Sequence, residues 1–258
     1  MADVRYGSLA APGSVNEDYL VAGPTWAFVL DGATAPAGVD SGCRHDVRWL
    51  VEHLAAHLAV PLTLGTSAPL TDVLADAIAA TRGDHEATCD LDNPDSPSST
   101  VAILRRRGNA VDHLVLADSA VVLDIGGDVR CVTDDRLDHL PSYTPDVVAA
   151  HRNRPGGFWV ASTSLDAPYE AITGSSPASD VRRAAVVTDG VMRYVELLGL
   201  GDWADLLDDL GFEGPYGVIA RIRAAEEARF GTDPRGPTGK RIKKHDDATA
   251  AYVLMEHT

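Results

Sequence analysis

The chain of 258 residues is long enough to bury a sizeable hydrophobic core, and no linker divides it, so we expect a single domain over residues 1–258. Its formal net charge of −16 disfavours a nucleic-acid partner, because neutralising phosphates requires a basic face. No apolar run reaches about 18 residues and the first residues lack a basic start followed by an apolar stretch, so we expect no membrane span and no secretory signal.

The first part of the chain is expected to hold short strands and then two helices. In SVNEDYLVA the acidic pair Glu17-Asp18 precedes a short apolar run, and in TWAFVLDGATAP the apolar residues 26–30 stop at Asp31-Gly32. Apolar residues recur at helical spacing over residues 45–58 and again over 69–81, which predicts an amphipathic helix in each range.

The central part, residues 99–133, is typical of an antiparallel meander, because short apolar runs alternate with tight turns. Asp118 stands at one of these turns, and a later strand ends at Asp189-Gly190. Three helical segments follow, then a loop over residues 231–245 and a last strand, ATAAYVLM. Antiparallel runs separated by helices indicate an α+β fold rather than a parallel βαβ fold.

The strand ends carry an unusual number of carboxylates. Asp-Gly after a strand usually marks a hairpin turn, yet no partner strand follows Asp31-Gly32 and a helix follows Asp189-Gly190. Acidic residues stand at five such boundaries: Glu17-Asp18, Asp31, Asp118, Asp189 and Asp246-Asp247. Carboxylates that meet in a cleft repel one another unless a cation binds, and hard oxygen ligands suit Mg²⁺ or Mn²⁺. Each residue alone is compatible with an ordinary turn, whereas the ordered set favours a metal site.

In chain order, the motifs NED, DG, SST, ADS, TDG and DDAT resemble those of the metal-dependent protein phosphatases of type 2C. The resemblance extends from Asn16 to Thr249. It implies an α-β-β-α sandwich, in which two packed antiparallel sheets are flanked by helix pairs. It also implies two Mg²⁺ or Mn²⁺ ions as cofactors, with room for a third.

The resemblance assigns the principal metal ligands to residues of this chain. Asp31 would bridge two ions, the carbonyl of Gly32 would bind one of them, and Asp189 and Asp246 would hold the other. These aspartates would be catalytic, because two cations lower the pKa of a bridging water, which then attacks phosphorus directly.

The resemblance also implies roles for acidic residues around this centre. Glu17 and Asp18 would bind metal or metal-bound water, and Asp118 would line an accessory metal position. The chain carries no GxSxG, P-loop or GxGxxG motif that would support a competing enzyme class.

Several family positions that contact phosphate are replaced in this chain. The arginine expected four residues before Glu17 is Gly13, and the histidine expected after the Asp-Gly pair is missing from residues 33–36. Ala117 and Ala120 stand where the family has a glycine and an arginine. The metal ligands therefore persist while the usual phosphate contacts do not.

Nearby basic residues are candidates to replace these contacts. Arg44 and Arg48 stand at the start of the helix predicted over residues 45–58, where a helix N-terminus attracts phosphate, and His45 could protonate the leaving alkoxide. The alternative is a surface histidine on a solvated basic edge. Arg193 is a second candidate for binding phosphate.

A basic run precedes the last acidic motif and consists of Lys240, Arg241, Lys243 and Lys244. It would form either a solvated loop or a positive collar that attracts a phosphorylated substrate.

The chain has three cysteines without a C-x-x-C spacing, namely Cys43, Cys89 and Cys131. This pattern argues against a disulfide framework or a zinc knuckle and favours a reducing, cytoplasmic location. Cys43 and His45 could form a soft-metal pair, but we expect no zinc site because two ligands lack partners. His53 and His57 share a helix face that we expect to be solvated.

The sequence therefore predicts a metal-dependent phosphomonoesterase, most simply a phosphatase of phosphoserine and phosphothreonine in proteins. A phosphorylated small metabolite is the alternative substrate, which the missing arginine keeps open. A third interpretation is a non-catalytic regulatory module of the same fold. The presence of Asp31, Asp189 and Asp246 favours an enzyme over that module.

Overall fold

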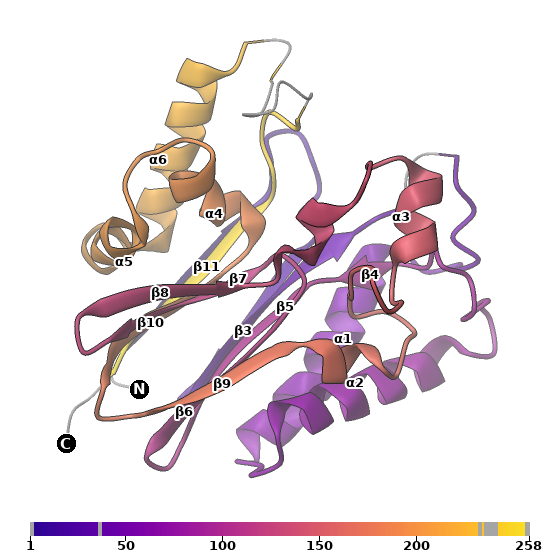
Figure 1. The fold of residues 1–258 in the computed structure, drawn as a ribbon, viewed down its shortest axis with the longest axis horizontal. Helices are drawn as coiled ribbons and strands as arrows, with labels where there is room; N and C mark the ends of the chain where they lie inside the picture. Colours follow the sequence, from indigo (N-terminus) through magenta and orange to yellow (C-terminus); the bar gives the residue numbers. More distant parts are fainter. Residues whose placement is uncertain (1–2, 36–37, 232–233, 235–241, 256–258) are drawn as a thin grey trace.

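Figure 1 shows the computed structural model of the chain, which describes residues 3–35, 38–231, 234 and 242–255. Two antiparallel sheets pack face to face, and helices cover their outer faces. The predicted α-β-β-α sandwich is therefore confirmed. Among the described residues, no helix has the length and apolar character needed to cross a bilayer.

The first sheet contains, in spatial order, β1 (Asp3–Leu9), β11 (Ala248–Leu254), β10 (Val181–Val187), β7 (Ala120–Ile125) and β8 (Asp128–Thr133). The second sheet contains β2 (Asp18–Gly23), β3 (Trp26–Ala33), β5 (Val101–Arg107), β6 (Ala110–Leu116) and β9 (Ile172–Pro177), and the short β4 (Ser98–Ser99) pairs with β3. The outer face of the first sheet is covered by α4 (Asp189–Glu196), α5 (Trp203–Phe212) and α6 (Gly214–Arg229). The outer face of the second sheet is covered by α1 (Val47–Thr63) and α2 (Leu70–His85).

The strand β3 explains why the run before Asp31 is apolar without alternation. Ala27 and Val29 face the other sheet, whereas Trp26, Phe28 and Leu30 pack against α1 and α2. All five side chains are buried, because this strand is covered on both faces.

The predicted meander over residues 99–133 is wrong in one respect. β5 pairs with β6 in the second sheet and β7 pairs with β8 in the first, while β6 and β7 belong to different sheets. The chain crosses between the sheets at residues 117–119, where Ala117 has a φ of 66°. Two hairpins in separate sheets have the same sequence pattern as a meander. Strand alternation and turn residues indicate which consecutive strands form a hairpin, but not whether two hairpins belong to the same sheet.

The chain leaves the sandwich between β8 and β9. This excursion contains η1 (Asp135–His139), α3 (Pro145–His151) and η2 (Ala167–Glu170). Figure 1 shows α3 beside one end of the two sheets, on the right of the view above α1 and α2. The excursion therefore lies at the end of the sandwich where several strands end.

Candidate functional site

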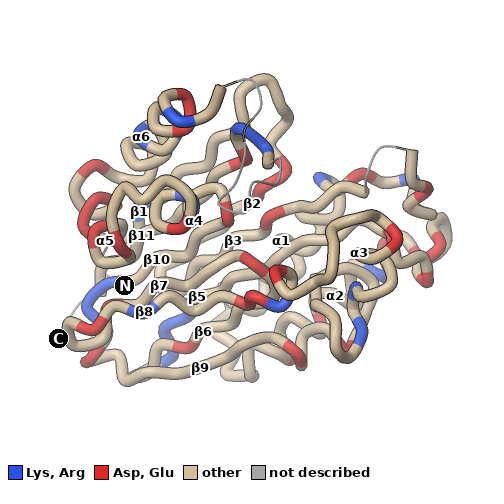
Figure 2. Tube along the Cα trace, turned by 45° about the horizontal axis from the view of Figure 1, so that its top comes forward, with Lys and Arg blue, Asp and Glu red and all other residues tan. Residues whose placement is uncertain are grey.

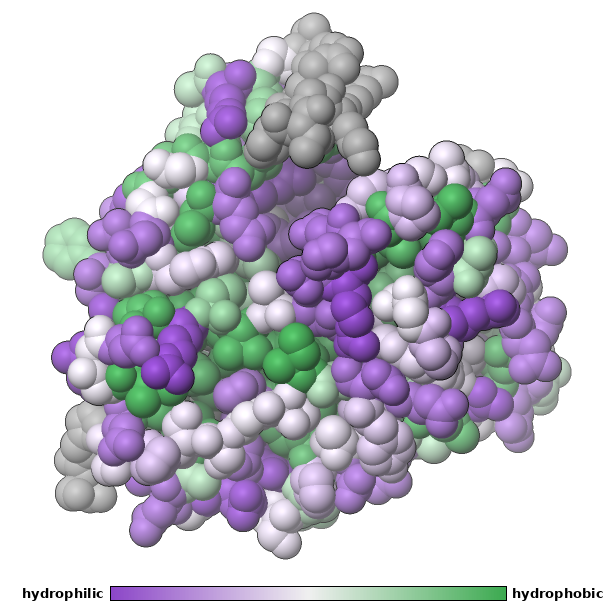
Figure 3. Space-filling view, in the orientation of Figure 1, coloured by the Kyte–Doolittle hydropathy of each residue, from purple (hydrophilic) through white to green (hydrophobic). Residues whose placement is uncertain are grey.

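Carboxylates from both sheets meet in one cavity of about 480 Å³. The acidic residues that line it are Glu17, Asp31, Asp118, Asp189 and Asp246, and Gly32 lines it as well. Asp31 lies near the end of β3, Asp189 begins α4, and the other acidic residues lie in connections, so regular elements hold all of them in place. Figure 2 shows acidic segments gathered where the sheets end beside α3, and Figure 3 shows a hydrophilic hollow between the α4 side and the α3 side.

Asp18 lies behind this cavity and faces Asp31 across the β2–β3 pair. Cross-strand partners project from the same face of a sheet, so the register itself brings these two carboxylates together. The hydroxyl of Thr188 donates to Asp18 Oδ2 at 2.9 Å, which ties β2 to the strand end before α4. Asp18 Oδ1 is buried without a hydrogen-bond partner among the described residues. This atom therefore has an unsatisfied capacity for a cation or a water molecule.

The electrostatics of the cavity disfavour its anionic form when no cation is present. Burial raises the pKa of Asp31 well above its usual range, and the charges of Asp18 and Asp189 raise it further. Burial and the charge of Asp246 raise the pKa of Asp189 to about 8. Burial also raises the pKa of Asp18 to about 7, although hydrogen bonds from Thr249 and Thr188 oppose this shift. Among the described residues, the carboxylates of Asp31 and Asp189 accept no hydrogen bond and form no ion pair.

This donor set fits divalent cations such as Mg²⁺ and Mn²⁺. The acidic side chains that line the cavity offer carboxylate oxygens, which hard cations prefer. A bound cation would supply the positive charge that the unpaired carboxylates of Asp31 and Asp189 lack.

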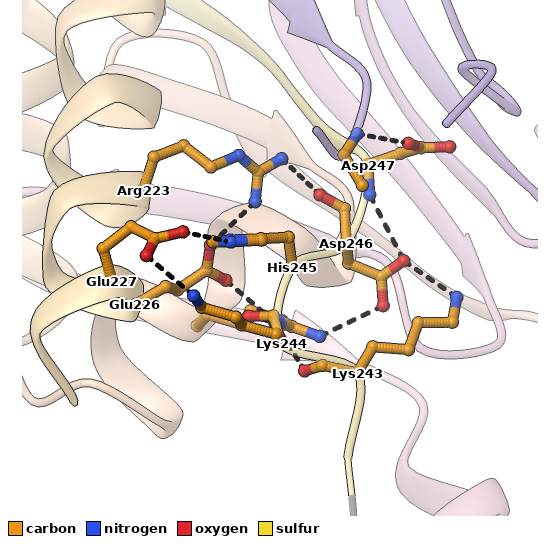
Figure 4. Close-up of polar contacts among 10 residues, drawn as sticks. Arg223, Glu226, Glu227, Lys243, Lys244, His245, Asp246 and Asp247 are labelled. Carbon is orange, nitrogen blue, oxygen red and sulfur yellow. Dashed lines mark hydrogen bonds and ion pairs between the residues drawn. The ribbon is translucent and has the colours of Figure 1, made fainter. Parts of the chain in front are cut away.

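The carboxylate of Asp246 is held by basic residues in a network that Figure 4 draws. Its two oxygens accept from Arg193 at 3.1 Å and from Lys243 Nζ at 2.9 Å. Arg193 also donates to Glu226, a fully buried residue of α6 that additionally accepts from Arg223 at 2.9 Å and contacts His245 Nδ1 at 2.6 Å. Arg193 therefore positions a predicted metal ligand rather than lining the cavity, and Glu226 fixes Arg193.

Asp247, the neighbour of Asp246, explains how the NED motif is positioned. Its two carboxylate oxygens accept from the backbone N–H groups of Ala11 and Glu17, both at 2.7 Å. Asp247, the residue before β11, thereby anchors the segment that presents Glu17 to the cavity. The sequence analysis placed Asp247 among the strand-end carboxylates without giving it this role.

Arg152, at the end of α3, lines the same cavity and was missed by the sequence analysis. It donates to the carbonyls of Pro94 and Ser96 at 3.1 and 3.2 Å, and its Nε is buried without a hydrogen-bond partner among the described residues. Burial lowers its pKa, and no carboxylate of the described residues lies within ion-pair distance. A partly buried guanidinium without an ion-pair partner is a ready binding group for an anion. No motif or spacing in HRNRPGG indicates this role.

Comparison with known families agrees with this geometry. Residues 8–214 match the sequence model described as protein phosphatase 2C, which covers most of the chain. The chain belongs to the protein phosphatase 2C family. No curated protein matches it in sequence.

Solved phosphatase structures of this type share the fold. The serine/threonine phosphatase PstP/Ppp of Mycobacterium tuberculosis superposes with a TM-score of 0.62 and 19% identity, over 98% of this chain and 99% of that one. The PPM Ser-Thr phosphatase MsPP of Mycobacterium smegmatis gives 0.61 and 14%, over 99% of both chains. The PstP catalytic domain in complex with two manganese ions gives 0.54 and 18%, over 98% of this chain and 99% of that one.

In this member of the protein phosphatase 2C family, the basic residues predicted around the helix start do not line the cavity. Arg44 and Arg48 are exposed, and Arg48 pairs with Glu52 at 3.6 Å. His45 stacks on Trp49, with 4.1 Å between the ring centroids, and its Nδ1 lies 3.4 Å from Cys89 Sγ. None of the three predicted residues therefore reaches the carboxylates.

The basic run before Asp246 is only partly described, because Lys240 and Arg241 lie outside the described residues. Lys243 lines the cavity, whereas Lys244 pairs with Glu227 at 2.7 Å. Burial at the cavity rim lowers the pKa of Lys243. The negative charges of Asp246, Asp189 and Asp31 outweigh this effect, so the pKa of Lys243 is raised overall.

Two interpretations of the histidines and cysteines are wrong. Cys43 and His45 do have partners, because His85 and Cys89 from the end of α2 meet them. The face of α1 that carries His53 and His57 is not simply solvated, since both rings contact Asp84 Oδ2, at 2.7 and 2.8 Å. In both cases the partners lie at the end of α2 or just after it, 27 to 46 positions along the chain and beyond the reach of helical spacing.

The glycine of each Asp-Gly pair permits a close backbone approach. A Cβ at Gly32 would lie 2.7 Å from the carbonyl oxygen of Glu17, and one at Gly190 would lie 1.9 Å from that of Asp247. Neither glycine has a positive φ, so these pairs do not form the hairpin turns that Asp-Gly usually marks. Because these glycines have no side chain, the backbone at Gly32 packs against Glu17 and the first turn of α4 packs against Asp247.

We expect Gly190→Ala to destabilise the fold by about 3 kcal/mol, because the new methyl group would overlap the backbone of Asp247. Gly83→Ala in α2 is the matched control: its Cβ would meet nothing within 4 Å, and alanine favours a helix by about 1 kcal/mol. Urea denaturation of both variants measures the difference. Equal stability of the two variants would contradict the packing account.

Proposed function

We propose that this chain is a metal-dependent phosphatase that hydrolyses phosphoserine and phosphothreonine in proteins. The observation that carries the proposal is one cavity in which five carboxylates face two basic side chains, Arg152 and Lys243. The carboxylates suit divalent cations and the basic groups suit a phosphate ester. The similarity in fold to the phosphatase PstP, which was solved with two manganese ions, supports this function.

Asp31, Asp189 and Asp246 would hold the cations, with Glu17 and Asp118 at the edges of the same cavity. When bound, such ions lower the pKa of coordinated water and offset negative charge on a phosphoryl group. Arg193 and the Glu226 network keep the Asp246 carboxylate oriented toward the cavity.

The guanidinium of Arg152 would bind the phosphoryl oxygens from the α3 side of the cavity. Its Nη1 is already engaged by the loop carbonyls of Pro94 and Ser96, which leaves Nη2 for the substrate. Lys243 enters from the opposite segment and would contribute a second positive charge once cations replace it at Asp246. These two residues would thus stand in for the arginine that Gly13 replaces.

An apolar wall on the excursion side borders the cavity and consists of Leu137, Val148, Phe158 and Val160. This wall would contact the substrate beside its phosphate group. A peptide segment around phosphoserine or phosphothreonine offers apolar surface there, as does the organic part of a small phosphomonoester.

The function is tested by supplying Mn²⁺ and comparing phosphoserine and phosphothreonine peptides with small sugar and nucleoside monophosphates. We expect kcat/KM to be higher for the peptides. A preference for one small phosphomonoester would assign the alternative substrate class. Failure of the folded protein to hydrolyse any of them, with either Mn²⁺ or Mg²⁺, would instead identify a non-catalytic module.

We expect Arg152→Ala to raise KM for a phosphopeptide by about tenfold or more, because one charge-assisted hydrogen bond contributes about 1.5 kcal/mol or more. Arg154→Ala is the matched control, since this exposed arginine is close in the chain and does not line the cavity. Arg44→Ala and Arg48→Ala test the alternative positions and are expected to leave KM unchanged.

Arg152 also holds the loop at Pro94 and Ser96, so Arg152→Lys is included to separate binding from structure. Lysine keeps the charge but loses the forked geometry, so an intermediate KM is expected. A normal KM in Arg152→Ala, together with a raised KM in Arg44→Ala or Arg48→Ala, would transfer the phosphate contact to the helix start.

A further inference from the structure

We propose that Cys43, His45, His85 and Cys89 bind a zinc ion at a second site, separate from the carboxylate cavity. Their ligand atoms lie within 4.8 Å of one another. None of the four residues lines the cavity. Two thiolates and two imidazoles are the ligand set of structural zinc sites, which close around the metal without an open position.

The distances within this cluster match tetrahedral coordination. Cys43 Sγ lies 3.8 Å from His45 Nδ1 and 3.5 Å from His85 Nδ1, and Cys89 Sγ lies 3.4 Å from His45 Nδ1. Zinc bonds of about 2.3 Å to sulfur and 2.0 Å to nitrogen place sulfur and nitrogen about 3.5 Å apart in a tetrahedron. The two sulfurs, now 3.0 Å apart, would need to separate to about 3.8 Å.

The local structure presents these ligands from two segments. Cys43 and His45 precede α1, while His85 is in the last turn of α2 and Cys89 follows it. The segments are joined by a backbone hydrogen bond from Asp90 N to Gly42 O at 2.8 Å. His85 is almost fully buried and the other three ligands are half-buried, so the site is partly shielded from bulk water.

The convergence of two imidazoles distinguishes a metal site from a cysteine pair poised for a disulfide. A disulfide between Cys43 and Cys89 would need only the sulfurs, yet His45 Nδ1 approaches both of them and His85 Nδ1 approaches Cys43. The third cysteine, Cys131 on β8, takes no part in the cluster.

A zinc ion here would tie together the two ends of the α1–α2 hairpin. The chain after Cys89 continues to Pro94 and Ser96, whose carbonyls accept from Arg152. The metal would therefore stabilise the loop that holds a cavity residue, without contacting the substrate itself.

Purified protein is predicted to contain about one tightly held zinc ion per chain, as a closed site of four such ligands requires. The metal content is measured by mass spectrometry after removal of loosely bound ions. X-ray absorption at the zinc edge should then detect two sulfur neighbours at about 2.3 Å and two nitrogen neighbours at about 2.0 Å. Oxygen-only coordination would place the zinc among the carboxylates and overturn the proposal.

Cobalt substitution separates this site from the other candidate metal-binding groups of the described residues. Co²⁺ bound to Cys43 and Cys89 should produce a thiolate charge-transfer band and the intense visible bands of tetrahedral coordination. The His53–His57–Asp84 group could bind cobalt as well, but it has no sulfur and cannot produce the charge-transfer band.

Cys43→Ser and Cys89→Ser should lose the bound zinc and the charge-transfer band, whereas the matched control Cys131→Ser should keep both. His85→Ala should weaken binding, whereas His139→Ala, an exposed histidine outside the cluster, should not. If the serine variants fail to fold, the absorption and cobalt spectra of the wild-type protein still decide the question. A Cys43–Cys89 disulfide in protein purified without oxidant, or unchanged zinc content in both serine variants, would overturn the proposal.

Discussion

Replacing Asp31 by asparagine is expected to lower turnover of a phosphopeptide by about 10³-fold or more, because this carboxylate lies at the centre of the proposed metal site. Asp31 lies near the end of β3, faces Asp18 across the strand pair, and lines the cavity with the other carboxylates. Asparagine has nearly the same shape but lacks the negative charge that holds a divalent cation. Calorimetry should therefore detect weaker Mn²⁺ binding in the variant that has lost turnover.

The same substitution is expected to raise the Tm of the metal-free protein. Burial and neighbouring carboxylates raise the pKa of Asp31 well above its usual range, so its ionised form is unfavourable in the folded state. A neutral asparagine removes this repulsion, and a pKa difference of one unit corresponds to about 1.4 kcal/mol. A loss of activity with a rise in Tm cannot be explained by unfolding.

Asp128→Asn is the matched control for Asp31→Asn. Asp128 begins β8, is exposed and pairs only with Arg130 among the described residues, at 2.7 Å. It should leave both turnover and Tm unchanged. Near-normal turnover of Asp31→Asn at saturating Mn²⁺ would remove Asp31 from the metal site.

Removing divalent cations with EDTA is expected to abolish phosphatase activity, and Mn²⁺ or Mg²⁺ is expected to restore it. Without cations, the carboxylates at the cavity repel one another, and Asp246 remains paired with Lys243 and Arg193. Zinc content is measured in the same samples, so that loss of the carboxylate-bound ions is not confused with loss of a thiolate-bound one. Full activity after exhaustive chelation would contradict the metal-dependent mechanism.

Metal-free protein is also expected to lose stability as pH rises from about 4 to about 8. The pKa values of Asp18 and Asp189 are raised to about 7 and about 8 in the folded state, above the ordinary value of about 3.9 in the unfolded chain. Between these pKa values the folded state binds more protons than the unfolded state, so the free energy of unfolding falls as pH increases. Their contribution to stability is complete below about pH 4 and is lost as pH passes the folded pKa values.

The measurement is urea denaturation of EDTA-treated protein across this pH range, with and without Mn²⁺. Because the cation replaces the protons, its stabilising effect should be larger at pH 8 than at pH 5. Asp128→Asn, with its exposed carboxylate, should keep the wild-type slope, whereas Asp189→Asn should flatten it. If the free energy of unfolding of the metal-free protein does not change with pH, protonation of these carboxylates is not linked to folding, and the prediction is wrong.

The sequence analysis predicted the sandwich and most helices, but it misjudged how strands are partnered. Residues 99–133 have the pattern of a meander, whereas β6 and β7 lie in different sheets. Helical periodicity predicted α1 only to residue 58, although it continues to Thr63 and contains Pro61. These differences arise because a local pattern indicates whether a segment is a helix or a strand. How long the element is, and which sheet a strand joins, depend on the elements it packs against.

The carboxylates were found from the sequence because they occupy strand ends, and strand ends are visible as the last residue of an apolar run. The groups that would bind phosphate were not. Arg44 and Arg48 were favoured because they follow Asp31 closely in the chain, but they point to the surface. Arg152 enters the cavity from an excursion more than a hundred positions later, where no periodic pattern marks it.

The sequence by itself determined the α+β class and the ordered set of acidic motifs, because apolar periodicity and residue order are properties of neighbouring positions. Only the tertiary structure decided that Arg152 shares a cavity with Asp31, and that Cys43 meets Cys89, 46 positions away. Such contacts depend on how sheets and helices pack. Packing brings together residues whose separation along the chain follows no repeat, so no spacing rule could have identified them.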